Sequence, residues 1–436
     1  MAPSRLLATP VPSPDVAKAL PADSLARAFL LAARAVAAVI AGRSLAEVPL
    51  APAGELPATR ASAQDLAYGA LRRFGQGDAL LAPLLARPLD KPEVHALLLC
   101  ALYRLESRPD AVHTVVDQAV EAAGQLARGA LRGLVNGVLR SYLRQRETLL
   151  AGLKGDEATY WHPAWWLRRL RQAYPDAWPQ IAAAGNAQPP MSLRVNRRRC
   201  TRDDYRARLL AVDIAADPVG EASLRLARPQ PVDALPGFAD GWVSVQDAGA
   251  QRAAGLLDVA AGQRVLDACA APGGKTAHLL ELADLDLLAL EMEAARARRI
   301  DENLARLGLS AQVRVTDCRK VKAWWDGRPF DRILADVPCT ASGVVRRHPD
   351  SKWLRREADI ASFARTQRQI LDALWPTLAA GGKLLYATCS VFPEENGGQV
   401  AGFIAAMPGA GLLGEAQLLP QADHDGFYYA LLQKAR

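Results

Sequence analysis

The chain has 436 residues, half of them hydrophobic, and a formal net charge of +7. A chain of this length holds about two to four domains, and its hydrophobic content excludes a disordered protein. The basic excess comes mainly from arginine, whose guanidinium group binds phosphates with two N–H groups and stacks on bases. This excess favours a polyanionic partner such as nucleic acid.

Cysteine and histidine usage predicts neither a disulfide framework nor a metal site. The cysteines form no Cys-x-x-Cys pair, and the histidines are isolated. Scattered cysteines of this kind indicate a reducing compartment. The longest apolar run, 25–40, contains two arginines, is too short to span a bilayer and starts too late for an export signal. We therefore expect a cytoplasmic protein without metal or membrane association.

The N-terminal third is predicted to be helical. Residues 1–22 are rich in proline and are expected to form a disordered leader. Residues 23–150 show apolar residues at helical spacing and no convincing strand, which predicts a bundle of about six or seven helices. The expected helices are 25–40, 63–74, 78–86, 92–105, 111–122 and 126–145, with prolines 49, 52 and 57 in a loop. Basic residues of the last helix, including Arg132 and Arg140, favour an RNA-facing surface over a purely structural role.

Residues 151–240 differ in composition, because tryptophan and tyrosine alternate with arginine between 160 and 178. Such aromatic residues can stack on bases, but at this spacing they more often bury a small helix, and we favour the core interpretation. Strands are expected over 191–196 and 223–227, with a helix over 201–210. Arg197 and Arg198 add a basic edge. These features predict a small α/β domain.

From residue 241 the chain alternates between strand and helix patterns. The stretch 264–276, RVLDACAAPGGKT, predicts a buried strand, a glycine turn and the start of a helix. This is the beginning of a nucleotide-binding βαβ unit, where free N–H groups at the helix start meet a polar ligand. Its glycines do not fit the dinucleotide fingerprint G-x-G-x-x-G, which disfavours a nicotinamide-dependent dehydrogenase, and there is no G-x-x-x-x-G-K-[ST] phosphate loop.

Further strands are predicted over 285–290, 312–315, 332–336 and 383–387. Glu291, Asp317, Asp336 and the cysteines Cys339 and Cys389 follow their ends. Carboxyl ends of parallel strands meet at one edge of a sheet, where ligands bind, and an acid after the second strand commonly bonds the ribose hydroxyls.

The two cysteines at neighbouring strand ends are candidate nucleophiles, because a thiolate is strongly nucleophilic. Nearby cations raise the thiolate fraction, and the candidates for this role are Lys275, Arg346 and Arg347. Buried cysteines are more often inert, and we expect Cys100, Cys200 and Cys318 to be core residues.

Several motifs resemble those of the bacterial 16S ribosomal RNA cytosine-C5 methyltransferases of the Sun/Fmu type. The matching motifs are DACAAPGGKT, NLARLG, DVPCTASGVVRRHPD, YATCSVFPEEN and DGFYYALL, and upstream LVNGVLR, HPAWW, PPMSLRVN and LPGFADGWVSVQDA. The resemblance covers nearly the whole chain past the leader. It implies a multidomain protein with an all-α NusB-like domain (23–150), a small α/β linking domain (151–240) and a Rossmann-like α/β S-adenosylmethionine-dependent methyltransferase domain (241–436).

The resemblance also implies the chemistry. Cys389 would attack C6 of a cytosine, Cys339 would assist loss of the C5 proton and release of the enzyme, and Asp336 would bind the cytosine edge. S-adenosylmethionine would be held by Cys269, Ala270, Ala271, Pro272, Gly273, Gly274, Lys275, Glu291, Asp317 and Asp336. The implied partner is 16S ribosomal RNA, free or in an early small-subunit particle, and a monomer is expected.

This sequence departs from the family pattern at two places. Glu291 stands where many relatives have Asp, and Thr340-Ala341 stands where Ser-Ala or Ser-Gly is more usual. Both replacements keep the required groups.

Three alternatives stay open. A DNA cytosine methyltransferase would use the Pro-Cys cysteine, Cys339, as nucleophile, and the second motif with Cys389 argues for RNA instead. A non-catalytic RNA-binding or antitermination factor would need neither Cys389 nor the Gly273-Gly274 turn, and both are present. A methyltransferase acting on another RNA is the third.

Overall fold

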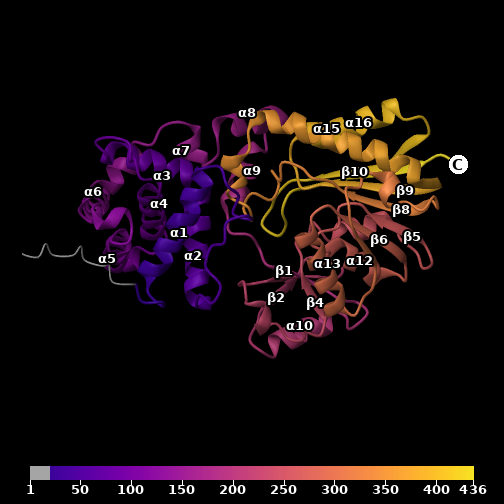
Figure 1. Ribbon diagram of the computed structural model, residues 1–436, viewed down its shortest axis with the longest axis horizontal. Coiled ribbons are helices and arrows are strands. Elements are labelled where there is room, and N and C mark those ends of the chain that lie inside the picture. Colours follow the sequence, from indigo (N-terminus) through magenta and orange to yellow (C-terminus); the bar gives the residue numbers. More distant parts are fainter. Residues whose placement is uncertain (1–19) are drawn as a thin grey trace, which may run out of the picture. The chain divides into compact units, whose positions relative to one another are not determined.

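A computed structural model describes residues 20–436 (Figure 1). The predicted leader, 1–22, lies almost wholly outside the described residues. The chain folds into two compact units, which divide between Thr159 and Tyr160.

The described residues of the first unit form helices and connecting loops and no strand (Figure 1). Helix α1 (Leu25–Ile40) is its centre: it packs on α2, α4 and α5, and Ser24 caps it by accepting a hydrogen bond from the Arg27 amide at 3.1 Å. The other helices are α2 (Pro57–Arg72), α3 (Phe74–Leu81), α4 (Pro92–Ser107), α5 (Val112–Ala123), α6 (Arg132–Ala151) and α7 (Asp156–Tyr160), with 3-10 turns η1 (Ala82–Leu84), η2 (Pro109–Ala111) and η3 (Ala127–Gly129). The predicted helical bundle is confirmed.

Three predicted helix starts were wrong. Helix α3 begins at Phe74 rather than 78, and it ends at Leu81 rather than 86. Helix α2 begins at Pro57, which was expected in a loop, because proline is well suited to the first turn, where its missing N–H costs nothing. Helix α6 begins at Arg132 rather than 126. Ala127 and Arg128 have φ of 48° and 56°, a left-handed conformation that an α-helix excludes.

The second unit begins with α8 (Ala164–Ala173) and α9 (Trp178–Asn186) and continues into a small antiparallel sheet of order β2-β3-β1-β4. Its elements are β1 (Ser192–Val195), α10 (Arg202–Leu210), β2 (Ala216–Pro218), β3 (Ser223–Leu226), η4 (Val232–Ala234) and β4 (Val243–Val245). Trp166 is 1% exposed and meets the Phe392 ring edge-on at 5.2 Å. The core interpretation of the aromatic segment is thus confirmed for this tryptophan.

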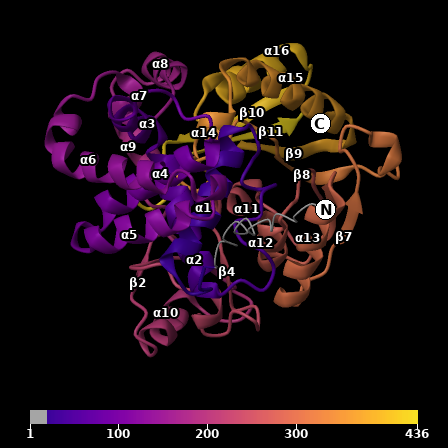
Figure 2. The same cartoon turned by 60° about the vertical axis from the view of Figure 1, so that its left-hand side comes forward.

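A seven-stranded mixed sheet forms the rest of the unit, in the order β10-β11-β9-β8-β5-β6-β7. The pairs among β5 to β9 are parallel, whereas β11 runs antiparallel to both β9 and β10 (Figure 2). The strands are β5 (Arg264–Asp267), β6 (Asp286–Glu291), β7 (Gln312–Val315), β8 (Phe330–Asp336), β9 (Leu378–Thr388), β10 (Ala410–Leu418) and β11 (Phe427–Lys434). The parallel part confirms the Rossmann-like prediction, and β10 and β11 were not predicted.

Helices cover both faces of this sheet (Figure 1). Val265 packs with α11, α12 and α13 on one face, and its neighbour Leu266 packs with α15 and α16 on the other. Successive side chains of a strand point to opposite faces, so a strand covered on both sides is apolar throughout. The covering elements are α11 (Arg252–Leu257), α12 (Gly274–Leu282), α13 (Ala294–Leu307), α15 (Glu357–Leu374) and α16 (Gly397–Ala406), with α14 (Ser351–Leu354), η5 (Val321–Ala323), η6 (Trp375–Thr377) and η7 (Pro393–Glu395) in the connections.

Among the helices of residues 20–436, none is both long enough and apolar enough to cross a membrane.

Candidate active site

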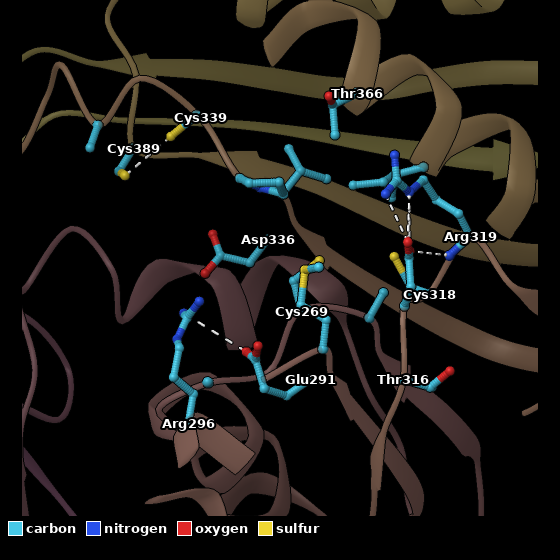
Figure 3. A pocket seen from close by; sticks show the side chains of 18 residues that line it. Cys269, Glu291, Arg296, Thr316, Cys318, Arg319, Asp336, Cys339, Thr366 and Cys389 are labelled. Carbon is cyan, nitrogen blue, oxygen red and sulfur yellow. Dashed lines mark hydrogen bonds and ion pairs between the residues drawn. The ribbon is translucent and has the colours of Figure 1, made fainter. Parts of the chain in front are cut away.

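A cavity of about 250 Å³ lies at the carboxyl ends of the parallel strands (Figure 3). The predicted site residues that line it are Cys269, Ala271, Glu291, Asp317, Asp336, Cys339 and Cys389. The remaining ones, Ala270, Pro272, Gly273, Gly274 and Lys275, belong to the adjoining turn and the start of α12 and do not line it. Sequence reasoning missed Arg296, Thr316, Arg319 and Thr366, and expected Cys318 only in the core, although all of them line the cavity.

The turn between β5 and α12 requires glycine at position 273. Gly273 has a φ of +95°, and a Cβ there would lie 3.1 Å from the Ile300 Cα in α13. Thr276 in the first turn of α12 donates a hydrogen bond at 2.7 Å to Asp267, the last residue of β5. Burial raises the pKa of Asp267 to about 7. This hydrogen bond between Thr276 and Asp267 therefore fixes strand β5 and helix α12 on either side of the turn that adjoins the cavity.

Glu291 ends strand β6 and presents a buried carboxylate to the cavity (Figure 3). It is 5% exposed, accepts a hydrogen bond from the Glu293 amide at 3.0 Å, and lies 3.8 Å from the Arg296 guanidinium. A carboxylate fixed in this way accepts hydrogen bonds from a vicinal diol such as that of ribose.

Asp317, just after β7, is held by a neighbour that the sequence did not single out. Arg319 donates to both oxygens of the Asp317 carboxylate, at 3.0 Å and 2.7 Å, and to the side-chain oxygen of Gln369 at 2.9 Å. These hydrogen bonds lower the pKa of Asp317. The cavity thus has a second fixed anion on its wall.

Asp336, at the end of β8, lines the cavity and pairs with Lys275 in α12, with the Nζ and Oδ2 atoms 2.6 Å apart. Burial acts to lower the pKa of Lys275, but Asp336, Cys389 and Asp267 outweigh it and leave the pKa raised. Lys275 therefore stays charged, with Cys389 inside its electrostatic reach.

The other two candidate cations are engaged elsewhere. The guanidinium groups of Arg346 and Arg347 both bind the buried carboxylate of Asp425, and Arg347 also binds Asp247 at 2.8 Å. Of the three predicted cations, Lys275 remains the candidate for acting on Cys389, whose charge contributes to the raised pKa of Lys275.

The two cysteines meet at the cavity (Figure 3). Cys339 follows β8 and Cys389 follows β9, and because these strands are hydrogen-bonded neighbours the two Sγ atoms lie 3.3 Å apart. The hydrogen bond to Cys389, burial, and the charges of Cys389 and Glu395 hold the pKa of Cys339 well above its usual range. This raised pKa favours the protonated thiol of Cys339.

Within the described part of the chain, no group of three or more His, Cys, Asp or Glu side chains is placed to hold a metal ion.

Family models match all three parts of the chain. The NusB family matches residues 29–144, a ferredoxin-like domain of RsmF/B-like methyltransferases matches 162–233, and the 16S rRNA methyltransferase RsmB/F model matches 254–433. A Klebsiella pneumoniae protein named ribosomal RNA small subunit methyltransferase B is 45% identical over 390 residues, covering 86% of this chain and 90% of that protein. The chain belongs to this methyltransferase B family. A Vibrio cholerae protein of the same name is 46% identical over 391 residues, covering 87% and 90%.

Solved structures agree with the methyltransferase B assignment at the level of fold. The crystal structure of PH0851 superposes with a TM-score of 0.79 at 22% identity, covering 95% of this chain and 99% of that one. A methyltransferase homologue from Pyrococcus horikoshii gives a TM-score of 0.58 at 26% identity, covering 64% and 97%. The predicted NusB-like, small α/β and Rossmann-like parts are confirmed, and the small sheet is ferredoxin-like.

The cofactor of this methyltransferase B family member is S-adenosylmethionine, and the cavity suits it. Buried acceptors at Glu291 match ribose hydroxyls, and the anionic Asp317 and Asp336 match an amine and an ammonium group. A cavity at the carboxyl ends of parallel strands is where such a fold binds a nucleoside.

Proposed function

We propose that this chain transfers a methyl group from S-adenosylmethionine to C5 of a cytidine in 16S ribosomal RNA, through a covalent bond between Cys389 and C6 of the base. The observation that carries the proposal is the pair of thiols, 3.3 Å apart, on the wall of the cavity that also holds Glu291 and Asp336. Relatives that are 45–46% identical are named small subunit methyltransferases, which supports the choice of RNA.

In the first step the Cys389 sulfur bonds to C6, and the electron pair of the C5–C6 double bond becomes available at C5. As the charge develops, N3 of the base takes up a proton. Asp336 accepts hydrogen bonds from this N3–H and from the exocyclic amine, and Lys275 holds the Asp336 carboxylate in place at 2.6 Å. S-adenosylmethionine supplies the electrophilic methyl group on its sulfonium.

The second step is release. The Cys339 thiol first gives its proton to solvent, and the resulting thiolate takes the C5 proton. The C–H electron pair then restores the C5–C6 double bond, and the Cys389 sulfur leaves as a thiolate. In the resting pair, the hydrogen bond to Cys389 and the charge of Cys389 raise the pKa of Cys339. Once Cys389 is bonded to carbon it carries no charge, so both effects weaken and the Cys339 proton becomes easier to remove. After the attack, Cys339 therefore forms more readily the thiolate that accepts the C5 proton.

The proposal is tested by mapping 5-methylcytidine in 16S ribosomal RNA from a strain lacking the gene. At least one cytidine should lose its methyl group, regain it with the wild-type gene, and fail to regain it with Cys389→Ala. If every 5-methylcytidine persists in the deletion strain, the proposed substrate is wrong.

Glu291→Ala should weaken S-adenosylmethionine binding by about 1–3 kcal/mol, or about 5–150-fold in Kd, because a buried acceptor for the ribose is lost. Calorimetry with the purified protein measures this. Glu293→Ala is the matched control, since its side chain is 61% exposed and also lies 3.8 Å from Arg296. Equal affinities of Glu291→Ala and wild type would remove the ribose role of Glu291.

RNA affinity should be largely electrostatic and carried in part by α6. Arg132 and Arg140 are exposed on this helix, whereas Arg197 pairs with Glu221 and Arg198 pairs with Asp284. Replacing Arg132 and Arg140 by alanine should reduce the slope of log Kd for RNA against log salt concentration by about 2. Replacing Arg197 and Arg198 should change it less, because carboxylates already neutralise them. A larger change from the second pair would reverse this assignment.

We also propose that the protein acts in the cytoplasm as a monomer and that the domains divide at residues 22, 150 and 240. The matched family ranges 29–144, 162–233 and 254–433 support the last point. Sedimentation of the purified protein tests the monomer.

A further inference from the structure

Glu395 is a buried carboxylate beside the two cysteine loops that the proposed chemistry does not use. It closes the 3-10 turn η7, is 0% exposed, and does not line the cavity. A buried carboxylate is unfavourable unless its oxygens are hydrogen-bonded, so its partners indicate why it is there.

The partners of Glu395 are the residues that directly follow the two cysteines. One carboxylate oxygen accepts from the Thr340 amide at 2.9 Å, and the other accepts from the Thr340 hydroxyl at 2.5 Å and from the Ser390 hydroxyl at 2.6 Å. The Gln367 side chain in α15 donates a fourth hydrogen bond at 3.0 Å. Four donors thus converge on one carboxyl group. Burial raises the pKa of Glu395, and the hydrogen bonds from Ser390, Thr340 and Gln367 act against that rise by favouring the carboxylate.

Further hydrogen bonds connect Glu395 to the sheet and add a second link between the loop after Cys339 and the loop after Cys389. The Tyr386 hydroxyl of β9 donates to the Glu395 carbonyl at 2.6 Å. Ser342 and Ser390 hydroxyls lie 3.0 Å apart, and the Gly343 amide donates to the Cys389 carbonyl at 2.8 Å. Fully satisfied buried networks of this kind rigidify their surroundings.

We propose that Glu395 is a positioning residue, which sets the separation and orientation of the Cys339 and Cys389 thiols by holding the residue after each of them. This inference rests on the proposed function of the two cysteines. The same carboxylate charge also contributes, after Cys389 and burial, to the raised pKa of Cys339.

Glu395→Gln is the sharpest change, because the amide has nearly the same shape. In one orientation its NH₂ group faces the Thr340 amide and the Gln367 NH₂ group, which can only donate. In the other orientation it forces the Thr340 and Ser390 hydroxyls to accept instead of donate. In both orientations the negative charge is lost and two of the four hydrogen bonds are broken or reversed. The matched control is Glu394→Gln, one residue earlier, where the side chain is 43% exposed and pairs with Arg169 at the surface.

The experiment measures kcat, the KM for 16S ribosomal RNA, and the Kd for S-adenosylmethionine of full-length wild type, E395Q and E394Q. We expect E395Q to lose about 10–100-fold in kcat, since small displacements of reacting groups have effects of this size. Its KM and cofactor Kd should stay within about twofold of wild type, because Glu395 lies outside the cavity lining. E394Q should match wild type in all three.

Two results would overturn the inference: an E395Q kcat within about twofold of wild type, or a loss of cofactor affinity as large as the loss of kcat. If E395Q does not fold, Ser390→Ala takes its place, since it removes one hydrogen bond of the bridge. A fall in the kcat of Ser390→Ala without a change in KM or cofactor Kd supports the inference. A kcat equal to that of wild type overturns it. Failure of the proposed function is distinguishable, because wild type itself would then not methylate the RNA.

Discussion

Cys389→Ala is expected to abolish methyl transfer and to form no covalent adduct with RNA, because it removes the sulfur that bonds to C6. Cys339→Ala should behave differently. The attack and the methyl transfer need only Cys389, whereas release needs a group that takes the C5 proton, and Cys339 lies 3.3 Å from the attacking sulfur. The Cys339→Ala protein should therefore accumulate bound to RNA.

A denaturing gel separates the two assignments. Cys339→Ala should give a retarded protein–RNA band, stronger when S-adenosylmethionine is present, and Cys389→Ala should give none. The target cytosine must leave its stack to reach the thiol, so unpaired cytidines should react best. An adduct formed by Cys389→Ala alone would show that Cys339 is the nucleophile, as in the DNA-type alternative.

Glu281→Ala should lower the free energy of unfolding by about 3–5 kcal/mol, because it leaves a buried charge without its partner. The Arg194 side chain in β1 is 0% exposed and that of Glu281 in α12 is 3% exposed. They are joined by hydrogen bonds of 2.9 Å and 2.7 Å, and Arg194 also donates to the Gly274 carbonyl at 2.7 Å. The pair therefore holds the small sheet to the cofactor turn.

Denaturant unfolding of the full-length protein measures this loss. Glu221→Ala is the control, because it breaks the ion pair between Glu221 and Arg197, whose side chains are 80% and 52% exposed, and it should change stability by less than about 0.5 kcal/mol. If Glu281→Ala had as small an effect as Glu221→Ala, the buried pair would not be the link between the sheet and the turn.

The parts of the fold that the sequence predicted are those with a strong local signal. Helix α1 was predicted with its observed bounds because Ser24, the apolar spacing and Gly42 mark them. Strands β2 and β4 have three residues each, too few for an alternation to show, and they form only by pairing with β3 and β1. The antiparallel pair of β10 and β11 was missed because strand pairing with β9 determines it.

The site residues divide in the same way, into those with a local sequence signal and those set by tertiary packing. The positions of the expected strand ends predicted that five residues gather at one cavity, because the topology of a parallel sheet places them there. These residues are Glu291, Asp317, Asp336, Cys339 and Cys389. Sequence could not rank the three cations, because what distinguishes them is the pairing of Arg346 and Arg347 with Asp425, nearly 80 residues later.

Glu395 lay inside a recognised motif without an assigned role, because its partners Thr340 and Gln367 come from distant segments. Which distant groups share a hydrogen bond depends on tertiary packing and has no local pattern.

The most direct measurement is nucleoside analysis of 16S ribosomal RNA incubated with the purified protein and S-adenosylmethionine carrying a labelled methyl group. Wild type should place the label in 5-methylcytidine alone, and Cys389→Ala should place none. Label in any other nucleoside, or undiminished label with Cys389→Ala, would contradict cytosine-C5 methylation through Cys389.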